Sequence, residues 1–309
     1  MRLREIFVFR NPKKEGKSMT VLGISGGTGF CGQEIIKRSI QKNIKVVSYQ
    51  RSKKKKCDYK VSEFSLENVA KIDVSLLDGV DTFVHGAALV HKKETSRNYQ
   101  ALNFLATKML FQMCAEAGVK KFIFFSTVGV YGLTSATKSL NLKSKLSPKT
   151  PYSKSKLDAE KFLVENSSSY GVEVLILRLP LVYGEEAPGN LGLLKKIINW
   201  RVPLPFKGVD NRRSIISVET LANVVTDYVL DKVKWQGVEL ITEPQPLSTE
   251  SIVSKLNKNE PIILFSVPKK VMKFIFLLAK KKMLYEKLFE DLVFESSQSV
   301  LEFVEKELK

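Results

Sequence analysis

Cysteine is scarce in this chain, and its three occurrences follow no recognisable pattern. Cys31, Cys57 and Cys114 lie far apart, without the paired spacing of metal-binding cysteines. An odd and sparse set of cysteines is typical of reduced thiols rather than of a disulfide framework. We therefore expect no metal site, no disulfide scaffold and a cytoplasmic location.

Long apolar runs are also absent. No segment approaches the roughly 18–20 apolar residues that a membrane span requires. The longest candidate, Val271–Ala279, is interrupted by Lys273 and flanked by lysines. We interpret it as a helix docked on the protein surface, and a basic amphipathic helix lying on a membrane is the alternative. Residues 1–18 lack the apolar core and cleavage site of a signal peptide, so we expect a disordered extension, with Met19 as an alternative start.

Acidic residues are outnumbered by basic ones. The chain has 50 Lys and Arg against 32 Asp and Glu, which gives a formal net charge of +18. Such a charge suits a nucleic acid, an anionic membrane or an anionic substrate. Because the basic residues are spread along the whole chain, solvated faces explain the charge equally well. Aromatic and basic platforms for stacked bases are not evident, so we expect no nucleic-acid partner.

The hydrophobic pattern alternates between strands and helices from Thr20 onward. With 44% hydrophobic residues, the 309-residue chain is long enough to bury a sizeable core. Phe122–Phe125 is apolar on both faces, as in the centre of a parallel sheet that helices cover on both sides. Strands are predicted near Thr20–Ser25, Lys45–Tyr49, Val61, Asp81–His85, Lys121–Ser126 and Glu173–Leu179, and helices near 99–117, 152–165, 191–200, 218–229 and from Pro268. This alternation predicts an α/β fold with a doubly wound parallel sheet.

A glycine-rich segment joins the first predicted strand to the first predicted helix. It matches G-x-x-G-x-x-G through Gly26, Gly29 and Gly32, and also G-x-G-x-x-G when it is read from Gly27. Glycines allow a tight turn and let backbone amides approach a pyrophosphate, which a helix N-terminus also attracts. The motif favours a Rossmann dinucleotide site over an incidental turn. The residues predicted to surround the cofactor here are Gly26, Thr28, Gly29, Phe30 and Gly32.

The chain is predicted to fold into two parts. We assign residues 19–182 and about 214–235 to an NAD(P)-binding Rossmann domain. Residues 183–213 and about 236–309 are expected to form a smaller C-terminal substrate-binding lobe over the carboxyl ends of the strands.

The end of the second predicted strand carries no carboxylate. NAD sites typically place an acidic residue there, about 20 residues beyond the glycine loop, to bind the ribose hydroxyl. The segment 48–56 contains Arg51 and a run of lysines instead. Arginine can hold a 2′-phosphate by paired hydrogen bonds, so NADP(H) is favoured over NAD(H). Most of Lys53–Lys56 is expected to be a solvated loop.

Tyr152 and Lys156 lie four positions apart in a predicted helix, which places them on one face. A phenol has a pKa of about 10, so it is a poor base at neutral pH. A nearby ammonium, helped by a cationic nicotinamide ring, is expected to lower that pKa, and a three-unit shift requires about 4 kcal/mol. Tyr152 could then exchange a proton with a substrate hydroxyl while a hydride moves. Thr127, with Ser126 beside it, is the candidate to hold the substrate oxygen.

Together these motifs resemble the extended short-chain dehydrogenases/reductases, the NAD(P)-dependent epimerase/dehydratase family that acts on nucleotide sugars. The resemblance extends from Met19 to about Val224. Its other markers are His85–Ala88, Asn103, Val130–Gly132, Arg178, Val182–Gly184 and Asn211–Ser214.

The resemblance implies roles for individual residues. Thr127, Tyr152 and Lys156 would be the catalytic triad, and Ala87, Ala88 and Asn103 would line the cofactor together with Tyr152 and Lys156. On the substrate side, Ser126, Asn190 and Leu191 would contact the nucleotide sugar, and Arg213 would grip its diphosphate. A homodimer is expected through the helices at 99–117 and 152–165. For His85 a packed imidazole is the preferred interpretation, and for Asn103 an ordinary polar helix face is an equal alternative.

The implied reaction is hydride transfer at C4 of a nucleoside-diphosphate hexose, as in UDP-glucose 4-epimerase or an NDP-4-keto-sugar reductase of polysaccharide biosynthesis. Leu181 stands where sugar epimerases often carry asparagine. Val128 and Gly129 stand where 4,6-dehydratases place an Asp-Glu pair, which disfavours dehydration. Residues after about Glu243 match only loosely. Epimerase and reductase remain open, and a non-catalytic NAD(P)-binding regulatory or RNA-binding module is the alternative.

Overall fold

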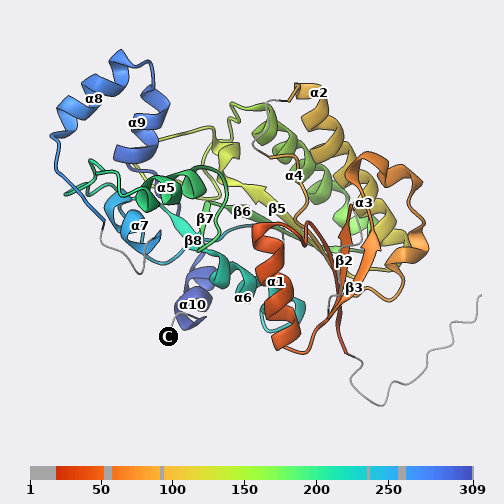
Figure 1. Cartoon of the computed structure of the whole chain (residues 1–309). Helices are drawn as coiled ribbons and strands as arrows, with labels where there is room; N and C mark the ends of the chain where they lie inside the picture. The colour runs from red at the N-terminus through yellow and green to blue at the C-terminus, as the bar shows by residue number, and fades with distance from the viewer. Residues whose placement is uncertain (1–18, 52–57, 91–93, 235–236, 257–261, 308–309) are drawn as a thin grey trace, which may run out of the picture.

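The centre of the protein is a seven-stranded sheet in which every pair of neighbouring strands is parallel (Figure 1). The computed structural model describes residues 19–51, 58–90, 94–234, 237–256 and 262–307, so the extension 1–18 and Lys53–Lys56 lie outside the described residues. The strand order is β3-β2-β1-β4-β5-β6-β9. The strands are β1 (Val21–Ser25), β2 (Lys45–Gln50), β3 (Lys60–Glu63), β4 (Thr82–His85), β5 (Lys121–Thr127), β6 (Glu173–Leu179) and β9 (Gly237–Leu240).

Helices cover both faces of this sheet. On one face α1 (Phe30–Gln41), α6 (Val218–Val229) and α10 (Gln298–Glu307) pack on a core that includes Ile24 and Ile123. On the other face α3 (Ala106–Glu116) and α4 (Pro151–Tyr170) pack on a core that includes Phe83 and Phe122. The central strand β5 is buried on both faces because its apolar residues supply both cores. The predicted doubly wound Rossmann sheet is confirmed.

Two short strands and four helices lie beyond the carboxyl ends of the sheet strands (Figure 1). They surround a further core, which contains Leu191, Phe206, Val253 and Phe289. The two strands, β7 (Leu181–Tyr183) and β8 (Ile215–Ser217), pair in parallel. The helices are α5 (Gly189–Asn199), α7 (Thr249–Leu256), α8 (Lys269–Leu278) and α9 (Lys282–Phe289).

The predicted boundary of the C-terminal lobe differs from the observed packing. The sequence predicts that residues from about 236 to 309 belong to the lobe, but β9 pairs with β6 and extends the large sheet. In α10, Val300 and Val304 are fully buried in the core under α1 and α6. The chain therefore returns to the sheet twice after β8, first where β9 pairs with β6 and then where α10 adds apolar side chains to the core that it shares with α6.

The predicted helix at 99–117 is built from three pieces. They are α2 (Ser96–Tyr99), the π-helical turn η3 (Gln100–Leu105) and α3. Such π turns are rare and often occur at functional sites. The remaining short helical turns are η1 (Leu66–Lys71), η2 (Val74–Leu77) and η4 (Val128–Tyr131).

Candidate active site

The glycine loop between β1 and α1 is packed so closely that side chains are excluded at two positions. Gly26 has φ +79°, and a Cβ there would lie 2.7 Å from the backbone nitrogen of Ala87. A Cβ on Gly32 would lie 2.2 Å from the carbonyl oxygen of Gly26. The loop thereby lies against the segment that follows β4, which is the point where the strand order reverses. Open α/β sheets bind their ligands at this point.

The first turn of α1 presents backbone N–H groups without a side-chain cap. Gly29 is the N-cap residue, and in the described part of the chain no side-chain cap hydrogen bond forms there. The turn contains no acidic residue, and Thr28 and Gly29 are exposed. Uncapped N–H groups and the helix dipole favour an anion such as a pyrophosphate. Phe30 contacts the Gly184 position, where a Cβ would lie 2.9 Å from the Phe30 ring.

Two polar side-chain atoms on β2 are buried without a hydrogen-bond partner among the described residues. They are the Gln50 amide oxygen and the Ser48 hydroxyl, and Ser48 lies directly beside Gly27. Because side chains alternate along a strand, Gln50 faces the same side as Ser48. An unpaired buried acceptor near the glycine loop fits a ribose hydroxyl as its missing donor. Sequence reasoning missed Gln50 because it searched this position only for a carboxylate, whereas Arg51, which follows it, is exposed.

The segment after β4 is held by a buried histidine and a buried asparagine. His85 is fully buried, with Nδ1 2.7 Å from the Ser25 hydroxyl and Nε2 2.9 Å from the Thr107 hydroxyl. Burial lowers the pKa of His85 to about 3, so the ring is neutral and packed, as preferred from the sequence. Asn103, in η3, accepts the Leu89 N–H at 2.7 Å and donates to the Leu89 carbonyl at 3.1 Å. Asn103 thus fixes the backbone beyond Ala87 and Ala88, and its own contact with a cofactor stays a prediction.

Tyr152 is placed by a tightly defined start of α4. Thr150 caps the helix and forms a reciprocal capping box with Ser153, and Pro151 occupies the first turn. The Tyr152 ring packs edge-on against Tyr99, with ring centroids 6.3 Å apart. Burial, then the charges of Tyr99 and Cys31, raise the pKa of Tyr152 to about 12. The side chain is therefore a neutral phenol between α2 and the glycine loop.

Lys156 lies one turn further along α4 and is 2% exposed. Its Nζ lies 4.0 Å from the centroid of the Phe124 ring on β5. Burial lowers the pKa of Lys156 to about 7, although the charge of Glu160 opposes the shift. The protein groups alone therefore raise the phenol pKa and lower the ammonium pKa. In the protein by itself, burial disfavours both charged forms. The predicted lowering of the Tyr152 pKa includes the charge of a bound nicotinamide ring and stays a prediction.

Thr127 ends β5 beside the first turn of α4. Its Oγ1 accepts the N–H of Gly129 at 3.0 Å. A Cβ on Gly129 would lie 3.3 Å from Thr127 Oγ1 and 3.5 Å from Ser153 Cβ, which places Thr127 near the residue that follows Tyr152. Since the hydroxyl accepts this bond, its hydrogen remains for donation to another oxygen. The structure thus brings the ends of β1, β4 and β5 together with the start of α4.

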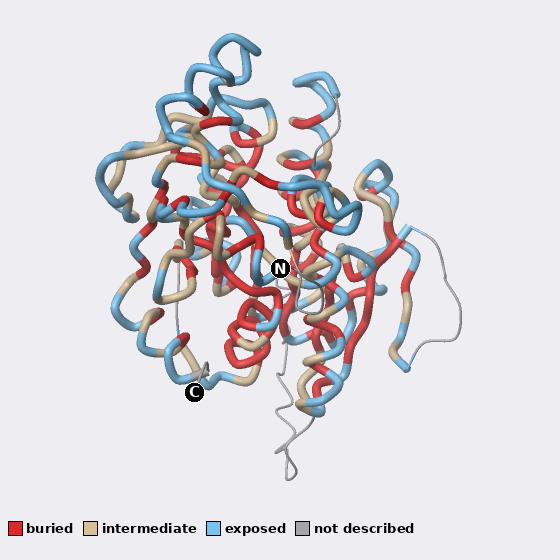
Figure 2. Tube along the Cα trace, turned by 60° about the vertical axis from the view of Figure 1, so that its left-hand side comes forward, coloured by how far each residue is buried: buried red, intermediate tan, exposed pale blue. Residues whose placement is uncertain are grey.

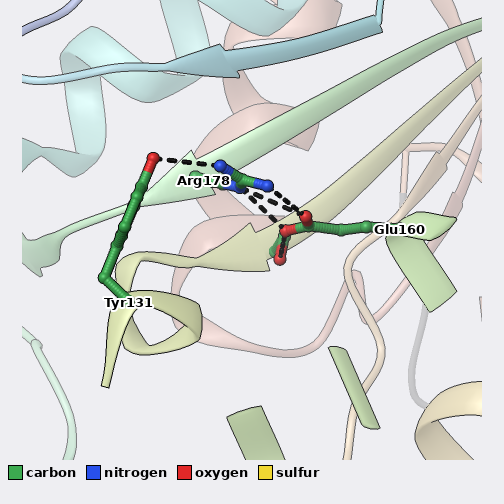
Figure 3. Close-up of polar contacts among 4 residues, drawn as sticks. Tyr131, Glu160 and Arg178 are labelled. Carbon is green, nitrogen blue, oxygen red and sulfur yellow. Dashed lines mark hydrogen bonds and ion pairs between the residues drawn. The ribbon is translucent and has the colours of Figure 1, made fainter. Parts of the chain in front are cut away.

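A buried network under the site joins α4 to β6 (Figure 3). Arg178 Nε donates to Glu160 Oε1 and Oε2 at 3.2 and 3.1 Å, and Arg178 Nη2 donates to Oε2 at 2.7 Å. Arg178 Nη1 donates to the Tyr131 hydroxyl at 2.9 Å. Ser126 is 4% exposed, and its hydroxyl donates to Glu160 Oε1. The hydroxyl hydrogen therefore already has a partner within the protein. Burial disfavours the Arg178 charge, but Glu160 outweighs this and raises the Arg178 pKa. Sequence reasoning missed Glu160, although it follows Lys156 by one helical turn.

The predicted substrate residues of the lobe differ in exposure. Asn190 is exposed in the first turn of α5, whereas Leu191 is 4% exposed and packs in the core of the lobe. Leu191 can therefore meet a ligand only through its backbone. Arg213 Nη1 donates to the carbonyls of Thr134, Glu286 and Glu290 at 3.1, 3.4 and 3.2 Å. Burial lowers the pKa of Arg213 to about 10, so it stays charged at neutral pH.

The chain is similar in sequence and in fold to known proteins. The UDP-glucose 4-epimerase of Vibrio cholerae is 29% identical over 242 residues, covering 75% of this chain and 74% of that protein. The Methanobrevibacter ruminantium UDP-N-acetylglucosamine 4-epimerase in complex with UDP-N-acetylmuramic acid has a TM-score of 0.70 at 19% identity, covering 94% of this chain and 96% of that one. The Bordetella bronchiseptica enzyme WbmG in complex with NAD has a TM-score of 0.69 at 20% identity, covering 93% and 88%. A sequence model of the NAD dependent epimerase/dehydratase family matches residues 22–234, more than half of the chain, and the protein belongs to that family.

Proposed function

We propose that the protein is a nucleotide-sugar 4-epimerase that retains a nicotinamide dinucleotide. The observation that carries the proposal is the position of Tyr152 and Lys156 on α4, one helical turn apart, with Lys156 buried and Tyr152 half-buried near Cys31 of the glycine loop. A binding module would not need a phenol and an ammonium there. One relative, which is similar over three quarters of the chain, is a UDP-glucose 4-epimerase, and this favours the same reaction.

The chain's own groups fit the dinucleotide at three points. The uncapped amides of α1 would hold its pyrophosphate, and the glycine loop leaves no side chain in the way. The unpaired Gln50 oxygen would accept a ribose hydroxyl. Ala87 and Ala88 would line the opposite side. When bound, the nicotinamide supplies a hydride acceptor and donor at C4 of the sugar.

Three side chains would handle the proton and the oxygen at C4. Thr127 would donate a hydrogen bond to O4, and Tyr152 would accept the O4 proton and later return it. Because burial raises the Tyr152 pKa to about 12, this role requires positive charge near the phenol when ligands are bound. Lys156 supplies part of it, and Glu160 supports the charged form of Lys156. Arg213 and the exposed Asn190 would hold the nucleoside diphosphate in the lobe, which we propose is the substrate-binding part.

A 4-ketoreductase, which would use one NADPH in each turnover and release it, is the second candidate, because the end of β2 carries Gln50 and Arg51 in place of a carboxylate. We propose that Arg51 allows NADP(H) to bind as well as NAD(H). This favours a reductase only if cofactor exchanges with each turnover. Val128 and Gly129 offer no acid–base pair for dehydration.

The test is to denature the purified protein and identify any released dinucleotide, then to assay interconversion of UDP-glucose and UDP-galactose without added cofactor. Stoichiometric release with turnover is expected. Tyr152→Phe should lose more than about a hundredfold in kcat yet retain the dinucleotide. Tyr170→Phe, on the same helix and 39% exposed, is the matched control. Turnover only with added NADPH and a 4-keto sugar would replace the epimerase with the reductase, and an indifferent Tyr152→Phe variant would exclude both.

We also propose a homodimer through α3 and α4. Leu105, just before α3, and Val164 on α4 are 49% and 50% exposed, as expected of side chains that a partner covers. Light scattering measures the oligomeric state directly. The parent protein should be a dimer, and the Val164→Glu variant should be a monomer.

A further inference from the structure

The helical hairpin of α8 and α9 presents an apolar stripe to solvent. In α8, Val271, Phe274, Ile275 and Leu278 recur at the i, i+3, i+4 and i+7 spacing of one helix face. These four residues are 46, 62, 49 and 68% exposed, respectively. A stripe with this spacing normally packs on a core, so its exposure marks a surface that binds something else. Nearby, Leu277, Met283 and Leu284 are 48, 60 and 43% exposed and extend the apolar face around the hairpin turn.

The opposite side of the hairpin holds it firmly on the protein. Met272 is 6% exposed, and the Phe276 ring lies 6.0 Å from Tyr285 and 5.9 Å from Phe289 by ring centroids. Phe289 in turn packs on Phe206 in the core of the lobe. The apolar stripe is therefore held outward by packing. The hairpin lies at the edge of the molecule furthest from β2 and β3 (Figure 1), and its trace is mostly exposed (Figure 2).

The same hairpin is strongly basic. Residues 269–289 contain seven lysines and one glutamate, a net charge of 7 − 1 = +6. The lysines are Lys269, Lys270, Lys273, Lys280, Lys281, Lys282 and Lys287. In the described part of the chain, only Lys269 and Lys282 among them have a carboxylate within 4.0 Å, at 3.6 Å from Asp210 and 3.8 Å from Glu286. Exposed apolar side chains flanked by unpaired lysines are the pattern of helices that lie in the headgroup region of anionic bilayers. A second copy of this face would instead bring like charges together.

We propose that the α8–α9 hairpin docks the protein on an anionic lipid bilayer. The stripe of Val271, Phe274, Ile275 and Leu278 would enter the boundary between headgroups and acyl chains, and the lysines would meet the lipid phosphates. Among the described helices none is long and apolar enough to span a membrane, so the attachment would be at the surface. Because Arg213 bonds to the backbone of α9 at Glu286, docking would turn the substrate lobe toward the membrane.

The experiment is co-sedimentation of the full chain with vesicles of phosphatidylcholine alone, or with about a third phosphatidylglycerol. Each lysine near an anionic surface contributes about fivefold to binding, so at least about tenfold stronger binding to the anionic vesicles is expected. High salt should weaken it. Phe274→Ser/Leu278→Ser and Lys270→Gln/Lys273→Gln/Lys281→Gln should each lose about tenfold or more. Ile40→Ser/Leu76→Ser, which changes residues 41% and 38% exposed outside the hairpin, is the matched control and should bind like the parent.

Circular dichroism and thermal unfolding establish that every variant is folded before its binding is compared. The proposal is overturned if the parent protein ignores anionic vesicles, or if the hairpin variants bind as well as the control. A third result would also overturn it. If light scattering shows a parent dimer that Phe274→Ser/Leu278→Ser converts to a monomer, without vesicle binding, the face is a contact between copies.

Discussion

Replacing Glu160 by glutamine tests how far the buried network under the site supports both stability and chemistry. The Glu160 and Arg178 side chains are 3% and 6% exposed, and the carboxylate accepts three hydrogen bonds from Arg178 and one from Ser126. Glutamine keeps the shape but leaves the Arg178 cation buried without a countercharge. Removing one partner of a buried ion pair costs about 3–5 kcal/mol, and we expect the lower end because the amide oxygen still accepts a bond.

The same substitution should change the charge of Lys156. Burial lowers the Lys156 pKa to about 7, and the Glu160 carboxylate works against that lowering. Without the carboxylate the pKa falls further, so a smaller fraction of Lys156 is charged at neutral pH. Activity that depends on the ammonium should then decline at a lower pH in Glu160→Gln than in the parent protein.

Urea unfolding and a pH profile of kcat measure the two effects separately. Asp158→Asn is the control. It removes a carboxylate that lies on the same helix and accepts a hydrogen bond from Gln100, so the unfolding free energy should fall by less than about 1 kcal/mol. Adding Arg178→Met to Glu160→Gln should restore most of the stability, because no uncompensated charge remains. A loss below about 1 kcal/mol in Glu160→Gln, or an unchanged pH profile, would refute the reasoning.

Three further predictions concern the cofactor side of the site. In urea unfolding, Gly32→Ala should lower the unfolding free energy by more than about 2 kcal/mol, because its Cβ would lie 2.2 Å from the Gly26 carbonyl oxygen. Gly29→Ala is the control: its Cβ would lie 3.2 Å from the same oxygen, and the loss should stay under about 1 kcal/mol. Between pH 7 and 9 the unfolding free energy of the parent protein should rise relative to that of Lys156→Met by up to about 1.4 kcal/mol per pH unit, because the lysine keeps its proton in the unfolded state and loses it in the folded state. Unfolding free energies that change with pH in parallel for the two proteins would contradict the lowered Lys156 pKa. Arg51→Ala should weaken NADPH about tenfold or more in a titration and leave NADH within about twofold, and equal losses would exclude a 2′-phosphate contact.

Most of the sheet and the cofactor side could be predicted from local pattern. Strand patterns predict β1, β2, β4, β5 and β6 as members of a parallel sheet, and the apolar run Phe122–Phe125 predicts the central place of β5, because burial on both faces leaves a continuous apolar signal. The glycine spacing predicts the loop that meets Ala87, since only glycine fits such a close backbone approach. The Tyr152 and Lys156 spacing likewise places both residues on one helix.

Other features depended on contacts between segments that are distant in the sequence. Glu160 meets Arg178 only because β6 lies beside β5, and Gln50 is recognisable as an unpaired acceptor only once its buried surroundings are known. Leu191 was expected at the ligand, but the packing of α5 turns its side chain into the core of the lobe.

The C-terminal third of the chain shows most clearly what the sequence determines and what the tertiary structure decides. Its sequence determines amphipathic helices, and the apolar spacing in 271–278 is visible without a structure. Which face each helix buries was decided by tertiary packing: α10 turns Val300 and Val304 into the main core, whereas α8 buries Met272 and leaves Phe274 in solvent. A helical pattern specifies which side chains share a face, but only the neighbouring surfaces determine whether that face meets protein, water or another partner.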